Sequence, residues 1–517
     1  MAKIELGKRI NQIFKKTKGW VKDHPKETVL LVLIILVGAF LRLYKIDQYM
    51  TFLGDEGRDV IIVRRLWVEA HPPLIGPGTS IGNMYLGPLY YYMMAIPLLI
   101  ANYSPVGPAV MVALLGVLTI FLVWWVAREW FGGIAAFFAA FFYAISPTVV
   151  IYSRSSWNPN IMPFFALASI YLMWRVWSKK ELRLLILAGI SFAFVVQSHY
   201  LGLALIPVMG ILWLLTFWQA KKDKKEKRKL IMNTIWGVAA FAILMSPLLI
   251  FDIRHNWQNF NAIKQFFTVR QDTVSIKPWN AIPKMYPRFE DINARLIAGR
   301  DVEVGKWTTI IVTGICAFLV LTKRKKLGSA FYLLIVWMGF ALLGFGLYKQ
   351  NIFDHYYGFV FAVPFILTGA IYQKLYKNNI VKILLVIGFL ILAYANFSNS
   401  ALNVGPNNQL KRSQDIAAFI RDRANGQRFN IATISERNNR DVYQYFFQVW
   451  GAKVVDTDPN AVAYTVTDQL FVVCEKPKEK CDPTHDPSAW IANFGWSKIL
   501  DQWEVSGVIV YKLGHNK

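Results

Sequence analysis

Two adjacent carboxylates stand out early in the chain, in the stretch Gly54-Asp55-Glu56-Gly57-Arg58. They follow the first long apolar segment, which places them near a membrane surface. Ionisable groups at a bilayer are costly and are usually retained for function. A carboxylate there can take a proton from a hydroxyl or an amine. The same two acids also suit the positive N-terminal end of a helix, which is a purely structural interpretation.

Five basic side chains lie in loops or at the ends of apolar segments and are candidates for binding an anion. A guanidinium or ammonium group can hold a phosphate. Each also has an ordinary interpretation, as a partner of a carboxylate, a snorkelling cation or an anchor at the membrane interface. The candidates are Arg58, Arg154, His199, Lys349 and His355.

The composition indicates a polytopic membrane protein. Of the 517 residues, 55% are hydrophobic and 17% are charged, and the mean hydropathy is +0.35. The formal net charge is +25, but the basic runs fall in short loops between apolar segments, as cytoplasmic loops do. They lack the interleaved aromatic residues of a groove for single-stranded nucleic acid, so no nucleic-acid partner is expected.

Twelve apolar segments are candidates for membrane helices, and the basic loops decide which of them cross. If 86–101 lies in the interface instead of crossing, every later basic cluster falls on the same side as the basic N-terminus. We therefore predict eleven spans. The crossing segments are 28–44, 106–127, 132–151, 160–177, 182–199, 201–218, 230–251, 306–322, 327–347, 356–373 and 380–397.

The predicted topology puts the N-terminal segment 1–27 in the cytoplasm and the C-terminus outside. Residues 28–397 form the transmembrane domain, with a first outer loop at 45–105 and a long outer loop at 252–305. The tail 398–517 mixes a helical stretch at 413–424 with short apolar runs, which predicts a small extracytoplasmic α/β domain. On that side a disulfide between Cys474 and Cys481 can form, although the sequence alone does not decide it.

The chain resembles the GT-C superfamily of membrane glycosyltransferases, and within it the protein O-mannosyltransferase and aminoarabinose transferase group. The resemblance covers residues 25–400. It rests on three motifs in order after the first span: Asp-Glu-Gly-Arg at 55–58, Gly-Pro-Leu-Tyr-Tyr at 87–91 and Tyr-Ser-Arg at 152–154.

The resemblance implies an enzyme that takes a sugar from a polyprenyl-phosphate donor and passes it to a protein, lipid or glycan acceptor. It implies that Asp55, with Glu56 beside it, acts as the base, and that the five basic residues named above bind the donor phosphate. Relatives often carry an acid a few positions after the arginine of the third motif. Asn158 and Asn160 stand there in this chain, which weakens the case for a divalent metal, and the cofactor is left open.

Two other functions remain open from the sequence. A ligase or polymerase of lipid-linked glycans usually has a large outer loop, and 252–305 meets that requirement. A transporter or flippase requires charges in the middle of spans, and few are present. No P-loop, zinc-protease or serine-hydrolase motif is found in the sequence. The sugar, the acceptor and the oligomeric state are not indicated.

Overall fold

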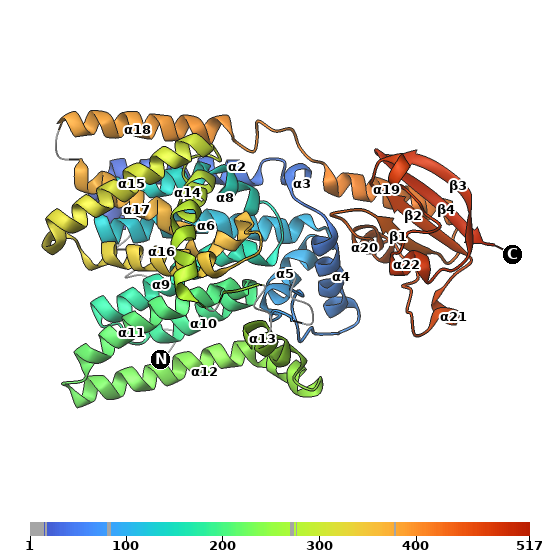
Figure 1. Cartoon of the computed structure of the whole chain (residues 1–517), viewed down its shortest axis with the longest axis horizontal. Coiled ribbons are helices and arrows are strands. Elements are labelled where there is room, and N and C mark those ends of the chain that lie inside the picture. Colours follow the sequence, from blue (N-terminus) through green and yellow to red (C-terminus); the bar gives the residue numbers. More distant parts are fainter. Residues whose placement is uncertain are drawn as a thin grey trace.

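The computed structural model describes residue 15 and residues 18–79, 84–268, 273–275, 277–376 and 379–516. Much of the expected cytoplasmic segment 1–27 therefore lies outside the described residues. The molecule has an elongated helical bundle at one end and a small domain with a β-sheet at the other (Figure 1).

The bundle consists of helices that run roughly along the long axis of the molecule (Figure 1). Their apolar residues face one another in the core and face outward on the rim, as expected for helices in lipid. The helices of the bundle are α2 (Pro25–Leu43), α6 (Val106–Phe131), α7 (Gly133–Ile145), α8 (Pro147–Tyr152), α9 (Met162–Lys179), α10 (Leu184–Ser198), α11 (Ile206–Ala220), α12 (Lys224–Arg254), α15 (Val302–Lys323), α16 (Ser329–Leu347), α17 (Ala362–Leu375) and α18 (Asn379–Ser398).

Seven helices of the described residues are long and apolar enough to cross a membrane, and an eighth span arises if the bent pair η5 (Asp354–Val360) and α17 is counted as one. The helices α7 and α10, which fall in two predicted spans, are shorter apolar helices. So is α5 (Leu89–Ile100), the segment predicted to lie in the interface. The number of eleven spans therefore stays a prediction.

Two of the predicted spans are broken helices. The segment expected as one span at 132–151 divides at Ser146 and Pro147 into α7 and α8, because proline cannot donate a hydrogen bond within a helix and fits its first turn. The segment expected at 356–373 bends by 56° between η5 and α17. Both breaks lie near the loops that carry candidate site residues.

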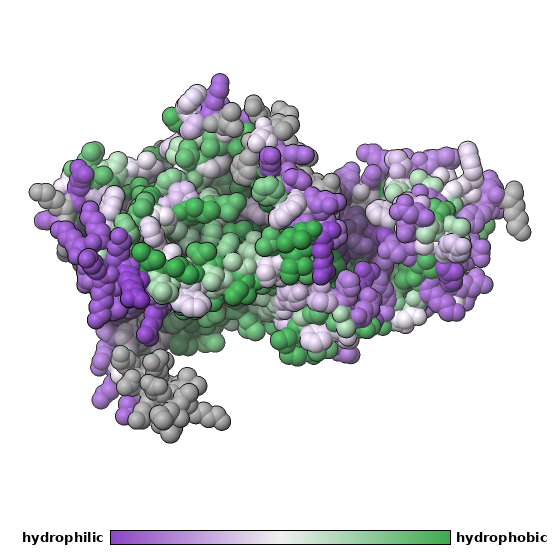
Figure 2. Space-filling model, turned by 90° about the horizontal axis from the view of Figure 1, so that it is seen from below, coloured by the Kyte–Doolittle hydropathy of each residue, from purple (hydrophilic) through white to green (hydrophobic). Residues whose placement is uncertain are grey.

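The surface of the bundle shows where a bilayer would lie. Apolar side chains cover the middle of the bundle, while hydrophilic side chains cover its far end and the C-terminal domain (Figure 2). The basic loops around residues 221–223 and 324–328 lie at the end opposite the C-terminal domain (Figure 1). The charged loops and the C-terminal domain are thus on opposite sides of the apolar region.

Shorter helices fill the loops at the end of the bundle next to the C-terminal domain. The first loop holds α3 (Ile46–Tyr49), α4 (Gly54–Val68) and α5, and these lie between the bundle and that domain (Figure 1). The long loop predicted at 252–305 is largely helical. It contains α13 (Gln258–Thr268), η3 (Pro278–Ala281) and α14 (Ile282–Leu296). The 3-10 turns η1 (Asn158–Ile161) and η2 (Tyr200–Leu205) precede α9 and α11, and η4 (Arg324–Lys326) lies at the opposite end of the bundle, between α15 and α16.

The C-terminal domain has a four-stranded sheet in the order β1-β2-β4-β3. The pair β1–β2 is parallel and the other two pairs are antiparallel. A disulfide joins Cys474 at the end of β2 to Cys481. The elements are α19 (Gln409–Arg423), β1 (Asn430–Ile434), α20 (Asp441–Val449), α21 (Val462–Thr465), β2 (Gln469–Cys474), η6 (Lys478–Lys480), α22 (Ala489–Ala492), β3 (Ser497–Val505) and β4 (Val508–His515).

The C-terminal domain and the first loop share one hydrophobic core. Buried side chains of α3, α4 and α5 form a single cluster with those of α19, α20 and the sheet. Phe52 and Phe446 lie 5.7 Å apart between ring centroids across this boundary. The backbone N–H of Phe52 donates to Gln409 Oε1 at 3.0 Å. The two parts are therefore packed as one unit, which fixes α4 against the C-terminal domain.

Candidate active site

The acidic doublet lies in the first turn of α4, where the helix dipole favours negative charge. Glu56 is turned back toward the start of the helix, and its Oε2 accepts a hydrogen bond from the backbone N–H of Leu53 at 3.1 Å. This contact satisfies a donor that the helix leaves unpaired. The described contact of Glu56 is therefore structural, and its share in catalysis stays a prediction.

Arg58 lies between two carboxylates of the same helix. Its Nη1 is 2.9 Å from Asp55 Oδ1 and its Nη2 is 2.7 Å from Asp59 Oδ1. Asp59 also accepts a hydrogen bond from the Tyr91 hydroxyl at 3.0 Å. The charge of Arg58 is thus already compensated, so its contacts favour orienting Asp55 over the predicted binding of a phosphate.

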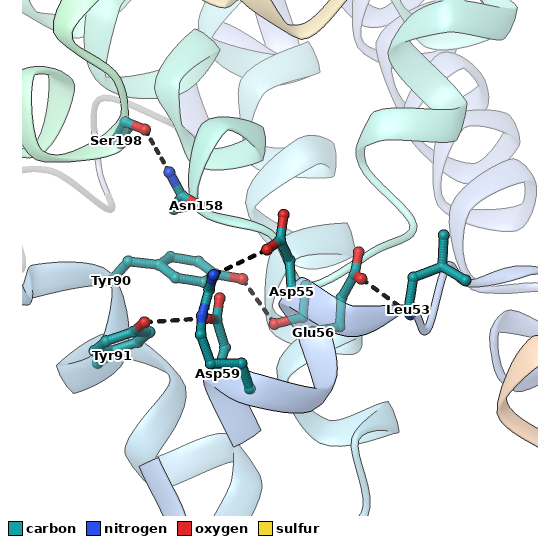
Figure 3. Close-up of polar contacts among 10 residues, drawn as sticks. Leu53, Asp55, Glu56, Asp59, Tyr90, Tyr91, Asn158 and Ser198 are labelled. Atoms are coloured by element: carbon teal, nitrogen blue, oxygen red, sulfur yellow. Dashed lines mark hydrogen bonds and ion pairs between the residues drawn. The ribbon is translucent and has the colours of Figure 1, made fainter. Parts of the chain in front are cut away.

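The three acids of α4 differ in their access to solvent. The side chain of Asp55 is 50% exposed, whereas that of Asp59 is fully buried and Glu56 is 5% exposed. Burial raises the pKa of Glu56 to about 7 and that of Asp59 to about 6. Asp55 is the one of the three whose carboxylate is open to solvent. In Figure 3 its carboxylate points away from the contact between Asp59 and Tyr91.

The second predicted motif, at residues 152–160, packs against the first loop. The backbone N–H of Thr51 donates to Ser155 Oγ at 3.0 Å, and Ser156 Oγ lies 2.7 Å from the Tyr90 hydroxyl. Asn158 Nδ2 donates to the carbonyl oxygen of Ser198 at 2.7 Å. This loop therefore connects the surroundings of Asp55 with the end of α10, where His199 follows.

Arg154 is buried at the base of this loop, with 2% of its surface exposed. Its Nη2 donates to the carbonyl oxygen of Tyr44 at 3.0 Å, and its guanidinium lies 4.2 Å from the centre of the Tyr49 ring. Nε and Nη1 are buried without a hydrogen-bond partner. Unpaired buried donors on a cation are costly, so this guanidinium can still accept an anionic partner.

His199 and His355 come together from distant parts of the sequence. Their ring centroids are 6.1 Å apart. His355 also packs on Trp157 at 4.4 Å, and His199 lies 4.8 Å from the ring of Tyr356. The structure therefore brings the second, third and fourth predicted segments into one cluster of histidine and aromatic side chains.

Lys349 lies just after α16 on the exposed surface. Its backbone N–H donates to the carbonyl oxygen of Thr273 at 2.9 Å, and the preceding residue, Tyr348, pairs with Val274 of the long loop. Tyr348 also packs against Tyr356 at 6.0 Å. Lys349 is thus near the histidine cluster in the fold, and its contact with a donor phosphate stays a prediction.

Among the described residues, no group of three or more His, Cys, Asp or Glu side chains has the geometry to hold a metal ion. Asn158, at the position where an acid was expected from the resemblance, donates to a backbone carbonyl. The requirement for a metal is left open.

Comparison with known proteins decides the fold. A family model described as dolichyl-phosphate-mannose-protein mannosyltransferase matches residues 86–251. The structure of ArnT from Cupriavidus metallidurans bound to undecaprenyl phosphate superposes with a TM-score of 0.58 and 14% identity, over 96% of this chain and 98% of that one. The chain has the GT-C fold. No curated protein sequence matches it.

A second GT-C structure is similar over most of the chain. Archaeal oligosaccharyltransferase AglB from Archaeoglobus fulgidus, in complex with an inhibitory peptide and a dolichol-phosphate, has a TM-score of 0.52 and 14% identity. The alignment covers 88% of this chain and 70% of AglB. The family match at 86–251 contains Arg154 and His199 but none of the acids of α4.

Two buried charged residues near the candidate site were not predicted from the sequence. Asp59 follows Asp55 by four positions and so lies on the same face of α4, which was a usable signal. Arg42 is fully buried in the last turn of α2. Its Nη1 donates to the carbonyl oxygens of Gly38 and Ala144, and its Nε has no partner. Nothing in its apolar sequence context marks it as more than a charge at the end of a span.

Proposed function

We propose that this protein transfers a sugar from a polyprenyl-phosphate donor to the hydroxyl or amine of an acceptor at the outer face of the cytoplasmic membrane. The family match, and the GT-C fold it shares with structures that hold lipid phosphates, support a glycosyltransferase with a lipid-linked donor. The observation that carries the proposal is the half-exposed carboxylate of Asp55 in the first turn of α4, held by an ion pair with Arg58.

In the proposed reaction the acceptor oxygen or nitrogen attacks the anomeric carbon of the donor sugar. The bond from that carbon to the phosphate oxygen breaks, and the electron pair leaves with the polyprenyl phosphate. Asp55 takes the proton of the acceptor as the new bond forms. A single displacement of this kind inverts the configuration at the anomeric carbon.

The basic side chains serve the leaving phosphate in this proposal. Negative charge grows on the phosphate as the bond breaks, and fixed positive groups stabilise it most when they need no reorganisation. Arg154 has two buried nitrogens without partners, and His355 packs on Tyr152 and Trp157 of the same loop and against His199. Arg58 orients Asp55, and Glu56 fixes the start of α4.

Transfer of a whole glycan is the second candidate, and one observation favours it. AglB is an oligosaccharyltransferase, and its fold matches this chain with a TM-score of 0.52. ArnT matches with a TM-score of 0.58 and over 98% of its own length. Because ArnT matches this chain better in size and fold than AglB does, we favour a donor that carries a single sugar. An assay that compares donors with one sugar and donors with several sugars distinguishes the two candidate functions.

The test is a transfer assay with the purified protein, polyprenyl-phosphate sugars and an acceptor. The measured quantity is the release of free polyprenyl phosphate. Asp55→Asn keeps the size and the contact with Arg58 and removes the base, so we expect transfer to fall by a factor of about 10² or more. Asp47→Asn, an exposed acid on the neighbouring α3, is the matched control and should retain activity. Full transfer by Asp55→Asn would remove Asp55 from the mechanism.

A further inference from the structure

The C-terminal domain contains a polar cavity of about 430 Å³ that none of the predicted site residues lines. Its volume is in the range of pockets that bind small organic ligands. It lies at the ends of the parallel strands β1 and β2, the edge at which open α/β sheets commonly bind ligands. The lining residues are Thr433, Ile434, Ser435, Asn438, Asn439, Lys476, Asp486, Pro487, Ser488 and Trp490.

The cavity is adjacent to the proposed catalytic helix. Asn439 in its wall lies directly against Gly54, since a Cβ added to that glycine would be 2.5 Å from Asn439 Nδ2. Gly54 precedes Asp55 in the first turn of α4. The next residue, Arg440, stacks on Trp490 at 4.7 Å. A ligand in the cavity is therefore separated from the start of α4 by one side chain.

Several polar groups of the cavity have no protein partner. Ser488 Oγ is buried without a hydrogen bond. Within the described part of the chain, Lys476 Nζ has no hydrogen bond or ion pair. Asn439 Oδ1 accepts from the backbone N–H of Asp441 at 2.9 Å, and its Nδ2 has no hydrogen bond there. Donors without a protein partner in a formed cavity are available to a ligand that has oxygen acceptors.

The mixture of groups favours a neutral saccharide over an anion. One lysine and one aspartate are the charged residues among the lining side chains, so their charges balance. Hydroxyls and amides make up most of the other polar groups, and they match the donors and acceptors of sugar hydroxyls. Trp490 offers an apolar ring for the C–H face of a sugar.

We propose that this cavity binds a sugar unit of the acceptor and presents the acceptor to Asp55. The cavity is formed by segments 433–439 and 486–490 together with Lys476. The proposal rests on the proposed function in one respect: that the bound sugar belongs to the acceptor. The C-terminal domain then selects acceptors, and α4 carries out the chemistry.

The test uses the full chain in lipid nanodiscs and saturation-transfer NMR with the methyl glycosides of glucose, galactose, mannose and N-acetylglucosamine as probes. We expect a signal from at least one glycoside. Ser488→Phe, which fills the cavity, should abolish it. Lys476→Ala, which removes one donor, should weaken binding about tenfold. The controls Ala489→Phe and Lys478→Ala change neighbouring residues outside the cavity and should bind as the wild type does.

The outcomes separate this inference from the proposed function. Glycoside binding that is unchanged in Ser488→Phe and Lys476→Ala overturns the inference, and so does an absence of binding, or binding of a serine-containing tripeptide at the cavity instead. In the transfer assay, Lys476→Ala should raise the acceptor KM about tenfold with kcat retained. If the wild type transfers no sugar, the proposed function fails, while the NMR result still decides whether the cavity binds saccharides.

Discussion

At the scale of single residues, α4 divides its three acids among different tasks. Asp55 is exposed and faces solvent, Glu56 closes the first turn, and Asp59 is buried under Tyr91. Arg58 links the first and the third of them. A cation held between two carboxylates has a fixed position, so it also fixes the direction of Asp55. The geometry of the proposed base thus depends on Arg58 and, through it, on Asp59.

The pairing of Arg58 with Asp59 leads to a prediction on stability. Arg58→Met leaves the buried carboxylate of Asp59 without its cation, so we expect a loss of about 3 kcal/mol in the free energy of unfolding. The double variant Arg58→Met with Asp59→Asn removes the unpaired charge and should recover part of that loss. Thermal unfolding in detergent measures both. Equal losses in the single and double variants would contradict the pairing.

The burial of Glu56 predicts a dependence of stability on pH. Its pKa is raised to about 7 in the folded protein, so the folded state binds a proton that the unfolded state has released. The contribution of Glu56 to stability therefore falls as pH rises from the ordinary glutamate pKa toward 7, and it is constant above 7. The variant Glu56→Gln has no titrating group at this position, so it lacks this pH-dependent contribution to stability. The melting temperature of the variant relative to wild type should rise between pH 5 and pH 7, and parallel pH profiles would refute the assignment.

Much of this residue-level site could be predicted from the sequence, because Asp55 and Glu56 stand out against an apolar chain. The contact partners of these side chains could not be predicted from the sequence. Whether Arg58 binds a phosphate or a carboxylate depends on Asp59 and Tyr91, and Tyr91 reaches α4 only through the packing of α5. The resemblance implied that His199 and His355 share a site, and the structure brings their rings within 6.1 Å, but the spacing of two positions so far apart in the chain does not by itself predict this.

At the scale of elements, the packing of α20 on α4 links the C-terminal domain to the proposed site. Gly57 allows this approach, since a Cβ at this position would lie 2.6 Å from the backbone nitrogen of Val442. Backbone atoms cannot move aside as a side chain can, so any larger residue would push the two helices apart.

We expect Gly57→Ala to destabilise the protein by about 1–3 kcal/mol despite the higher helix propensity of alanine, and to reduce transfer with it. Gly314→Ala in α15, where a Cβ would meet nothing within 4 Å, is the matched control and should be neutral or slightly stabilising. Thermal unfolding and the transfer assay measure both variants. A stable and active Gly57→Ala protein would show that the close approach is not needed.

The elements themselves were predicted unevenly. Long apolar segments and the amphipathic helix at 413–424 were recognised because their periodicity is strong. The break at Ser146 was missed because apolar residues continue on both sides of it. Strand β3 was missed because most of its residues are exposed, so its sequence lacks the alternation of a half-buried strand.

At the scale of the whole molecule, the proposed function requires one orientation in the membrane, with the C-terminal domain and α4 at the outer face. A cysteine at Ser506, in the exposed turn between β3 and β4, should react with a membrane-impermeant maleimide on intact cells if the C-terminal domain is outside. A cysteine at Lys222, between α11 and α12, should react only after permeabilisation. Both variants are made in a Cys316→Ala background. If Lys222→Cys is labelled in intact cells and Ser506→Cys is not, the orientation is the opposite of the predicted one.

The overall architecture was predictable because the bilayer restricts a chain to a few arrangements, and the basic loops select among them. The hydrophobic core that the first loop shares with the C-terminal domain was not predictable from the sequence. The sequence predicted a small α/β domain at 398–517, but the buried faces of α3, α4 and α5 that join its core are far away in the chain and come together with it only in the fold.

The most direct test of the account is an experimental structure of the Asp55→Asn protein with a polyprenyl-phosphate sugar bound. We predict that the phosphate lies within contact distance of Arg154, His199 or His355, and that the anomeric carbon of the sugar faces residue 55 with room for an acceptor between them. A donor bound elsewhere in the bundle, with its sugar remote from α4, would contradict the central claim.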